Sequence, residues 1–286
     1  MGTLHIVSTP IGNLEDLTLR GVRVLREVRL IAAEDTRHTR KLLNHYGITT
    51  PAISYHAHNE RARVEPILAA LAEGDVALVS DAGTPGVSDP GLELIRAAIA
   101  AGYPVTAAPG PVAAVTALVL SGFDPAHYTY LGFLPRQGRD RRALLMQVRE
   151  QPWPLVLYEA PHRLLDLLAD LLTVLGDRPC AVARELTKVH EEVVRGLLSA
   201  AQAHFTATPP RGEFTVVVDA APPPSAEVRA EAVASLEETA ATRLRAHIGA
   251  GTSGRDAVQQ VAGELGLPRR KVYNIWLALS DSETAQ

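Results

Sequence analysis

The sequence contains very little cysteine, and this scarcity excludes several kinds of protein. Cys180 is the only cysteine among 286 residues. No disulfide and no cluster of thiolates can therefore form within one chain, which fits a reducing cytosol. The ten histidines are scattered without the spacing of zinc ligands, and we expect no structural metal.

Long apolar runs are also missing. Apolar residues make up 47% of the chain, which is enough for ordinary cores, but no run approaches the roughly 18 residues of a membrane-spanning helix. The segment from Met1 to His5 has no basic region followed by an apolar stretch, so we expect no secretory signal. These absences predict a cytoplasmic protein with no membrane partner.

Two nucleotide-binding motifs are absent, and lysine is scarce. Neither G-x-G-x-x-G nor a P-loop occurs, which leaves a nicotinamide or nucleoside triphosphate site with little support. The only lysines are Lys41, Lys188 and Lys271, so 25 of the 28 basic residues are arginine. A net charge of −4 gives little support to a general nucleic-acid binder, although local arginine clusters stand out.

What is present is a loop rich in glycine, proline and aspartate, residues 80–91. It follows an apolar run, 76–79, typical of a buried parallel strand, and precedes a segment with apolar residues at helical spacing. Open α/β sheets bind their ligands at such strand-to-helix connections. Asp81 and Asp89 offer acceptors for hydroxyl or amino groups. A rigid loop with acidic helix caps is the alternative interpretation.

Five strand–helix alternations of this kind fill residues 1–121, which we expect to form the first domain. The expected strands are 4–8, 30–33, 52–55, 76–79 and 105–107. Their order implies a parallel sheet with helices on both faces. Three connections, 9–16, 80–91 and 109–114, are rich in glycine or proline and are expected to converge on one ligand. The polar run 34–41 is either a charged surface helix or a rim of that cleft.

Residues 122–220 are expected to form a second α/β domain. Tighter connections between its strands predict a mixed sheet, and a proline-rich linker follows at 220–225. Residues 227–286 form a small helical C-terminal domain in this prediction. Its last two helices resemble a helix-turn-helix with Arg269, Arg270 and Lys271 opening the second, although a purely structural cap is the alternative.

Four motifs together resemble the tetrapyrrole methylase superfamily. They are SDAGTPGVSDPG from Ser80, PGPVAAVTAL from Pro109, YEAPHRLL from Tyr158 and RELTKVHEE from Arg184. Three more are similar to the branch that methylates a cytidine 2′-hydroxyl of small-subunit (16S) ribosomal RNA: STPIGNLEDLTLR from Ser8, EDTRHTRKLL from Glu34 and HNE from His58. The resemblance covers residues 3–220.

The resemblance implies a two-domain tetrapyrrole-methylase-like fold, a homodimer, and S-adenosylmethionine in the cleft between the domains. The residues that it implies as cofactor contacts are Pro10, Ile11, Asp81, Ala82, Gly83, Thr84, Ala113, Ala114, Tyr158, Ala183, Arg184 and Glu213. The sequence departs from the superfamily in its first loop, where Thr9-Pro10-Ile11 replaces a glycine-rich turn. This departure suggests a differently shaped mouth for the acceptor.

Methyl transfer to a ribose hydroxyl needs a group that deals with the hydroxyl proton. The hydroxyl is too weak an acid to ionise near neutral pH, so a base takes its proton as the methyl moves. Lys188 is the first candidate, either as a base that has lost its charge through desolvation or as a cation that stabilises the alkoxide. Glu185 orients it or is itself the base. An ordinary surface ion pair is the alternative.

Arginines near the loops are candidates for registering the RNA by phosphate contacts. These residues are Arg37, Arg136, Arg139, Arg141 and Arg142. A solvated helix face is the alternative for the cluster at 136–142.

Three functions remain open from the sequence. The first is 2′-O-methylation of 16S ribosomal RNA, as free RNA or in the assembled small subunit. The second keeps the cofactor but takes a tetrapyrrole-like small molecule as acceptor. The third is a non-catalytic RNA-binding module, which a tight S-adenosylmethionine site would argue against.

Overall fold

The structure is a computed structural model that describes residues 2–223 and 225–284. The chain folds into two compact units, residues 1–221 and 222–286. Pro224 of the predicted linker and the last two residues of the predicted helical domain lie outside the described residues. Among the described residues, no helix is both long and apolar enough to cross a membrane.

The first sheet is parallel throughout, as predicted, and its order is β3-β2-β4-β1-β5. Its strands are β1 (Leu4–Val7), β2 (Leu30–Ala33), β3 (Ala52–Ser54), β4 (Val76–Val79) and β5 (Val105–Ala108). The helices that accompany them are η1 (Leu14–Asp16), α1 (Leu19–Glu27), α2 (Thr36–His45), α3 (Glu60–Glu73), α4 (Leu92–Ala100) and α5 (Ala113–Ser121).

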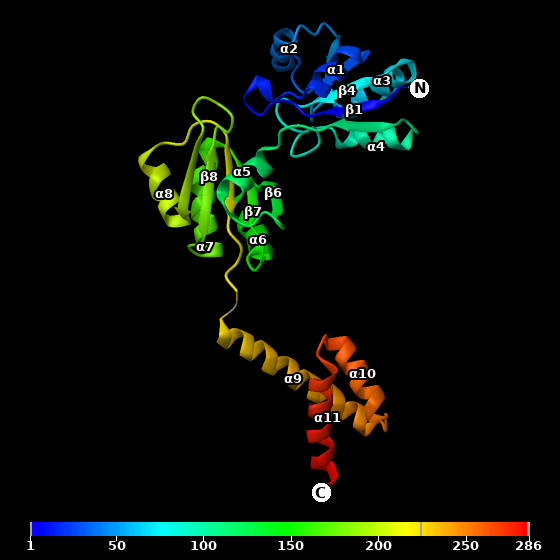
Figure 1. The fold of residues 1–286 in the computed structure, drawn as a ribbon, viewed down its shortest axis with the longest axis vertical. Helices are drawn as coiled ribbons and strands as arrows, with labels where there is room; N and C mark the ends of the chain where they lie inside the picture. The colour runs from blue at the N-terminus through cyan, green and yellow to red at the C-terminus, as the bar shows by residue number, and fades with distance from the viewer. Residues whose placement is uncertain (1, 224, 285–286) are drawn as a thin grey trace. The chain divides into compact units, whose positions relative to one another are not determined.

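Helices cover both faces of this sheet because its strands carry apolar side chains on both sides. In β4, Ala77 and Val79 belong to the core shared with α1 and α2, whereas Val76 and Leu78 belong to the core shared with α3 and α4. Figure 1 shows β1 and β4 between α1 and α4. The central strand is fully buried, and the loop that follows it is therefore held at a fixed place.

The starts of α1 and α3 use their polar residues differently. Thr18 caps α1, since its hydroxyl oxygen accepts the Gly21 N–H at 3.0 Å. Asn59 precedes α3 but does not cap it by its side chain, because its Oδ1 accepts the His56 N–H at 2.8 Å instead. The amide thereby closes the turn that leads into the helix.

The second sheet is mixed, as predicted, with the order β6-β7-β10-β8-β9. Its strands are β6 (Thr129–Phe133), β7 (Leu155–Glu159), β8 (Pro179–Arg184), β9 (Glu192–Leu197) and β10 (Phe214–Val218), and only the β6–β7 pair is parallel. One face packs against helices α6 (Gly138–Val148), α7 (Leu164–Leu175) and α8 (Leu198–Ala207), and η2 (Pro161–Arg163) precedes α7.

The other face of the second sheet packs against α5. Ala114, Ala117 and Leu118 of this helix share a core with Val156, Ala183 and Val217 of the sheet. The helix therefore follows the last strand of the first sheet but buries its apolar side on the second. A domain boundary after residue 121 stays a prediction, because residues 1–221 form one unit.

The described residues of the second unit form three helices, α9 (Ala226–Gly249), α10 (Gly254–Leu265) and α11 (Arg269–Thr284). Its core contains Ala240 and Leu244 of α9, Val261 of α10 and Val272 of α11. Ser253 caps α10 by accepting the Asp256 N–H at 3.2 Å, and Gly266 ends it in the left-handed conformation.

Candidate functional site

The loops after β1 and β4 are joined to each other by hydrogen bonds. The backbone N–H of Thr9 donates to Gly83 O at 2.8 Å, and the N–H of Gly83 donates to Thr9 O at 3.0 Å. The Thr9 hydroxyl donates to Ser80 O at 3.0 Å, and the hydroxyls of Ser8 and Thr84 lie 2.8 Å apart. The two loops therefore form one rigid wall at the carboxyl ends of their strands.

The loop after β4 contains a strained residue that connects it to the second sheet. Ser88 has a φ of 61°, which is costly for a side chain other than glycine. Its hydroxyl lies 2.7 Å from the hydroxyl of Tyr130. Tyr130 stands next to a register shift between β6 and β7, and such bulges re-aim side chains. The strained Ser88 thus contacts Tyr130 and joins the loop after β4 to the second sheet.

A cavity of about 280 Å³ lies against this wall, close to the lower limit of the roughly 300–1,000 Å³ typical of small-molecule sites. We call it the inner cavity. Residues of the first sheet's loops line it together with residues from the ends of β6, β7 and β10. They are Ile11, Ala82, Gly83, Thr84, Val87, Ser88, Asp89, Val112, Ala113, Phe133, Tyr158, Glu159, Ala160, Pro161, Glu213, Phe214 and Thr215.

Carboxylates gather at the inner cavity and next to it. Burial, followed by the charges of Glu34 and Asp81, raises the pKa of Asp89 to about 7. Burial also raises the pKa of Glu34, whose Oε2 accepts the Asp81 N–H at 3.2 Å. Glu213 lines the cavity as well. Because like charges oppose ionisation of one another, this cluster favours a ligand that carries positive charge.

A second cavity of about 490 Å³, which we call the outer pocket, adjoins the first. The two share Ala82 and Glu213 in their linings. The outer pocket is lined by Thr9, Pro10, Gly12, Leu14, His38, Thr39, Lys41, Leu42, Ser80, Asp81, Ala82, Lys188 and Glu213. It carries two lysines, unlike the inner cavity.

Lys188 lines the outer pocket and lies between two carboxylates, one of which, Glu213, also lines the inner cavity. Its Nζ donates to Glu185 Oε1 and to Glu213 Oε2, each at 2.9 Å. Desolvation alone would lower the pKa of Lys188, but the hydrogen bonds to the two carboxylates outweigh it, and the pKa is raised. Lys188 is therefore held as a cation, which disfavours the neutral base that the sequence allowed and favours the charged role.

Glu185 is fixed by the same cluster. Its Oε1 also accepts the Glu213 N–H at 2.9 Å, and its φ of 50° is strained. Burial opposes ionisation of Glu185, but the Lys188 ammonium and the Glu213 N–H overcome it and lower the pKa. Gly212 packs against this carboxylate so closely that a Cβ there would overlap it. The sequence could not predict this contact, which links residues 27 positions apart.

Most of the residues expected to contact the cofactor surround these cavities. Seven line the inner cavity: Ile11, Ala82, Gly83, Thr84, Ala113, Tyr158 and Glu213. Pro10 and Asp81 line the outer pocket. Ala114 lies one step behind, where its N–H donates to the Tyr158 hydroxyl at 3.1 Å.

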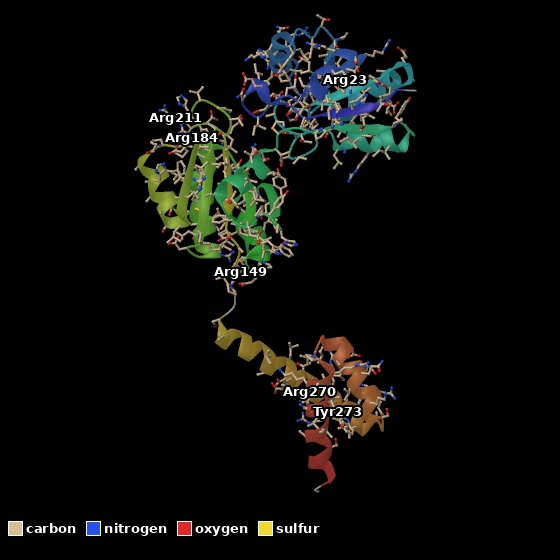
Figure 2. The ribbon with its side chains drawn as sticks, viewed as in Figure 1. Arg23, Arg149, Arg184, Arg211, Arg270 and Tyr273 are labelled. Carbon is tan, nitrogen blue, oxygen red and sulfur yellow. The ribbon has the colours of Figure 1, made fainter. Side chains whose placement is uncertain are left out.

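Besides Ala114, two more of the expected cofactor residues line neither cavity. Ala183 is buried in the core beneath α5. Arg184 turns away, and its Nε donates to Arg211 O at 2.8 Å (Figure 2). The residues that sequence reasoning left out of the site include Val112, Phe133 and Phe214, whose only signal was their position next to strand ends.

The arginines expected to contact RNA fall into two groups. Arg136, Arg139 and Arg37 are exposed, although Arg37 pairs with Asp35 at 2.8 Å. Arg141 is a correction to the prediction. Its side chain is only 7% exposed and pairs with Asp170 at 2.6 Å, so it supports the fold.

Arg142 shares that carboxylate with Arg141. Its NH1 lies 3.1 Å from Asp170 Oδ1, and its side chain is 49% exposed.

Among the residues that the structure describes, no group of three or more potential metal-ligating side chains lies close enough to hold an ion.

Comparison with known proteins identifies a family. The sequence profile described as "Tetrapyrrole (Corrin/Porphyrin) Methylases" matches residues 3–202. A protein of Synechocystis named "Ribosomal RNA small subunit methyltransferase I" is 47% identical over 281 residues, covering 98% of this chain and 99% of the relative. Relatives with the same name are 40% identical in Bacillus subtilis, over 96% of this chain and 94% of the relative, and 48% identical in Thermotoga maritima. The Thermotoga match covers 98% of that relative but only 76% of this chain.

Solved structures share the fold at lower identity. The methyltransferase CobJ aligns with a TM-score of 0.60 and 19% identity, over 77% of this chain and 95% of that one. Uroporphyrin-III-C-methyltransferase from Thermus thermophilus aligns with a TM-score of 0.53 and 22% identity, over 76% and 94%. At these identities the likeness shows the architecture alone.

Proposed function

The chain belongs to the tetrapyrrole methylase family, and we propose that it transfers a methyl group from S-adenosylmethionine to the 2′-hydroxyl of a cytidine in small-subunit ribosomal RNA. The observation that carries the proposal is the meeting of the inner cavity and the outer pocket at Glu213, beside the paired Lys188. Relatives named for small-subunit ribosomal RNA support the choice of acceptor. A cation placed where an alkoxide would develop supports the choice of a ribose hydroxyl.

The residues of the inner cavity fit S-adenosylmethionine, the methyl donor of this family. Val112, Phe133 and Phe214 offer apolar surface for a purine ring, and Asp89 and Glu213 offer negative charge to a sulfonium or an amino group. When bound, this cofactor supplies a methyl group on a positively charged sulfur. A cavity that is acidic and largely apolar is suited to such a cation.

The outer pocket fits an anionic acceptor. Lys41 and Lys188 line it beside the carboxylates of Asp81 and Glu213, so a phosphate of the RNA would contact the two lysines there. Lys188 then lies beside the hydroxyl oxygen as a cation and stabilises the negative charge that grows on it. Glu213 lines both cavities, and its side chain is 74% exposed. Its carboxylate then accepts the proton of the ribose hydroxyl.

The proposal is tested by following a labelled methyl group. Purified protein is incubated with methyl-labelled S-adenosylmethionine and either free small-subunit ribosomal RNA or assembled small subunits that lack the modification. Mass spectrometry of the digested RNA should then find label in 2′-O-methylcytidine for at least one of the two substrates. Label on a base, or RNA binding without transfer, would contradict the proposal. The Lys188→Ala variant is the control for label that does not depend on this site.

The implied homodimer and the cytoplasmic location stay predictions. Light scattering during size-exclusion chromatography measures the mass in solution and tests the first of them.

A further inference from the structure

The three-helix unit has a groove of its own, between the start of α10 and the face of α11. Its volume is about 450 Å³. Arg255 and Gln259 of α10 line it together with Arg269, Arg270, Tyr273 and Trp276 of α11. Figure 2 shows Arg270 and Tyr273 on this unit. We call it the helical groove.

The three arginines of the helical groove are exposed and available. No ion pair or side-chain hydrogen bond engages Arg255, Arg269 or Arg270 within the described part of the chain. Neighbouring cations of the same unit differ, since Lys271 pairs with Glu237 at 2.6 Å and Arg243 pairs with Glu264. No acidic side chain belongs to the lining of the groove. Three unpaired cations around one hollow favour a ligand that carries several negative charges.

Two aromatic rings stand beside these arginines. The rings of Tyr273 and Trp276 are 6.2 Å apart and inclined by only 19°, and Tyr273 is 48% exposed. The indole lies directly on the first turn of α10, because a Cβ at Gly254 would overlap it. The indole position is therefore fixed by the backbone, and the Tyr273 ring is left as an exposed flat surface.

Trp276 also has a polar atom that the fold does not use. Its Nε1 is buried and has no hydrogen-bond partner among the described residues. Buried donors are normally paired, so an unpaired indole N–H at a groove indicates a place where a ligand oxygen would be favourable.

We propose that the helical groove binds a single-stranded segment of RNA, with a base stacked on Tyr273 and phosphates against Arg255, Arg269 and Arg270. Flat aromatic surfaces bind unpaired bases, and arginines around them hold the backbone. A helix-turn-helix that reads duplex DNA uses its second helix in a major groove, but the major groove of an RNA duplex is too narrow for side chains. An unpaired strand therefore fits both the charge and the rings. The inference rests on the proposed function in one respect: the bound RNA is expected to be part of the RNA that is methylated.

The experiment uses the full chain and an unstructured RNA of about 12 nucleotides, a length within the range of single-strand sites. Trp153 and Trp276 are the only tryptophans, so a Trp153→Phe background leaves Trp276 as the single indole reporter. RNA should quench its fluorescence. In that background, Tyr273→Ala should weaken binding by roughly 5- to 100-fold, whereas Tyr273→Phe keeps the ring and should retain the affinity.

The arginines are tested by salt dependence. Replacing Arg269 and Arg270 by Ala should lower the slope of log affinity against log salt by about 0.7 for each lost phosphate contact. Lys271→Ala is the matched control, because the charge of Lys271 already pairs with Glu237 and its loss should leave the slope unchanged. Circular dichroism confirms that each variant is folded.

Three outcomes would overturn the inference. They are the absence of quenching, equal salt slopes in the arginine variant and the control, and tighter binding of a DNA duplex than of the RNA. Methyl transfer by the unchanged protein is measured separately. If transfer fails while RNA still quenches Trp276 in an arginine-dependent way, the proposed function fails and this inference stands.

Discussion

The inner cavity and the helical groove carry opposite charge. Acidic side chains line the cavity, among them Glu213 and Asp89, whose pKa is raised to about 7, whereas unpaired arginines line the groove. A cavity that favours a cationic methyl donor repels phosphates, and a groove that holds phosphates repels such a donor. The difference suggests that the chain separates recognition of its donor from recognition of the acceptor's backbone. The outer pocket combines both kinds of charge, because its lysines line it together with Glu213, which also lines the inner cavity.

The comparison depends on telling an arginine that is available to a ligand from one that supports the fold. Arg141 is buried against Asp170, so Arg141→Ala should lower the free energy of unfolding by about 3 kcal/mol, the lower end for a broken buried pair. The lower end applies because Arg142 still contacts the carboxylate. Arg139→Ala, on the exposed side of the same helix, should stay within about 0.5 kcal/mol. Denaturant titration measures both, and equal effects would mean that the burial of Arg141 contributes nothing.

Lys188 is the cation that adjoins the acidic cavity, and its replacement should remove most of the catalysis. Lys188→Ala should slow methyl transfer on the order of 10²–10³-fold, as expected for the loss of a group that stabilises a developing oxyanion. Lys188→Arg keeps the positive charge and should recover a good part of the rate. Single-turnover transfer at saturating cofactor measures the difference. An arginine variant as slow as the alanine variant would instead favour a neutral lysine base, since arginine stays protonated.

Gly212 tests how closely the Lys188 cluster is packed, and the protein offers a matched control. Gly212 and Gly102 have similar φ values, 85° and 79°, but a Cβ would overlap Glu185 only at Gly212 and meets nothing within 4 Å at Gly102. Both alanine variants should lose about 1–2 kcal/mol of stability from backbone strain. Only Gly212→Ala should also slow methyl transfer, by about tenfold, because it displaces the carboxylate that holds Lys188. Equal rates in the two variants would remove Glu185 from the positioning role.

Asp89 tests the acidic side of the comparison through pH. Burial and the charges of Glu34 and Asp81 raise its pKa to about 7, so the folded protein keeps a proton that the unfolded chain loses above about pH 4. Ionisation therefore costs stability progressively between these values, and the cost is constant above them. Asp89→Asn should stabilise the protein by about 1–2 kcal/mol near pH 8, after allowance for solvent screening of a half-buried group, and by less near pH 5.

The same change should weaken the binding of S-adenosylmethionine more near pH 8 than near pH 6, because only the ionised carboxylate attracts the cation. Melting curves and calorimetry at the two pH values measure the two effects. A stability difference that does not vary with pH would show that Asp89 ionises normally in the folded protein.

The parts of the fold that the sequence predicted are those with a strong apolar pattern. The strand β4 is buried along its whole length, and it was expected at residues 76–79. The strand β9, Glu192–Leu197, was not expected, because it lies at the sheet edge and half of its residues are exposed. An edge strand needs no apolar pattern on both faces, and its sequence therefore carries little signal.

The sequence predicted which loops form the candidate site. It did not predict the contacts between residues of those loops and residues distant in sequence. Asp81 and Gly83 were recognised by the composition of their loop. The left-handed backbone at Ser88 and Glu185 could not be predicted, because neither is glycine and each contacts a partner distant in sequence, Tyr130 and Glu213 respectively. Arg141 was assigned wrongly, because nothing in an arginine-rich run reveals which member meets a buried carboxylate.

The position of β10 has a consequence for how the protein is made. This strand is the last of the second sheet to leave the ribosome, yet it lies in the middle of the sheet, between β7 and β8. A nascent chain that ends before residue 213 holds two incomplete pairs of strands, each with an open edge prone to association. Glu213 and Phe214 join the cavity only when β10 inserts. Synthesis therefore completes the sheet and the binding site in the same step, and a chain released early has neither.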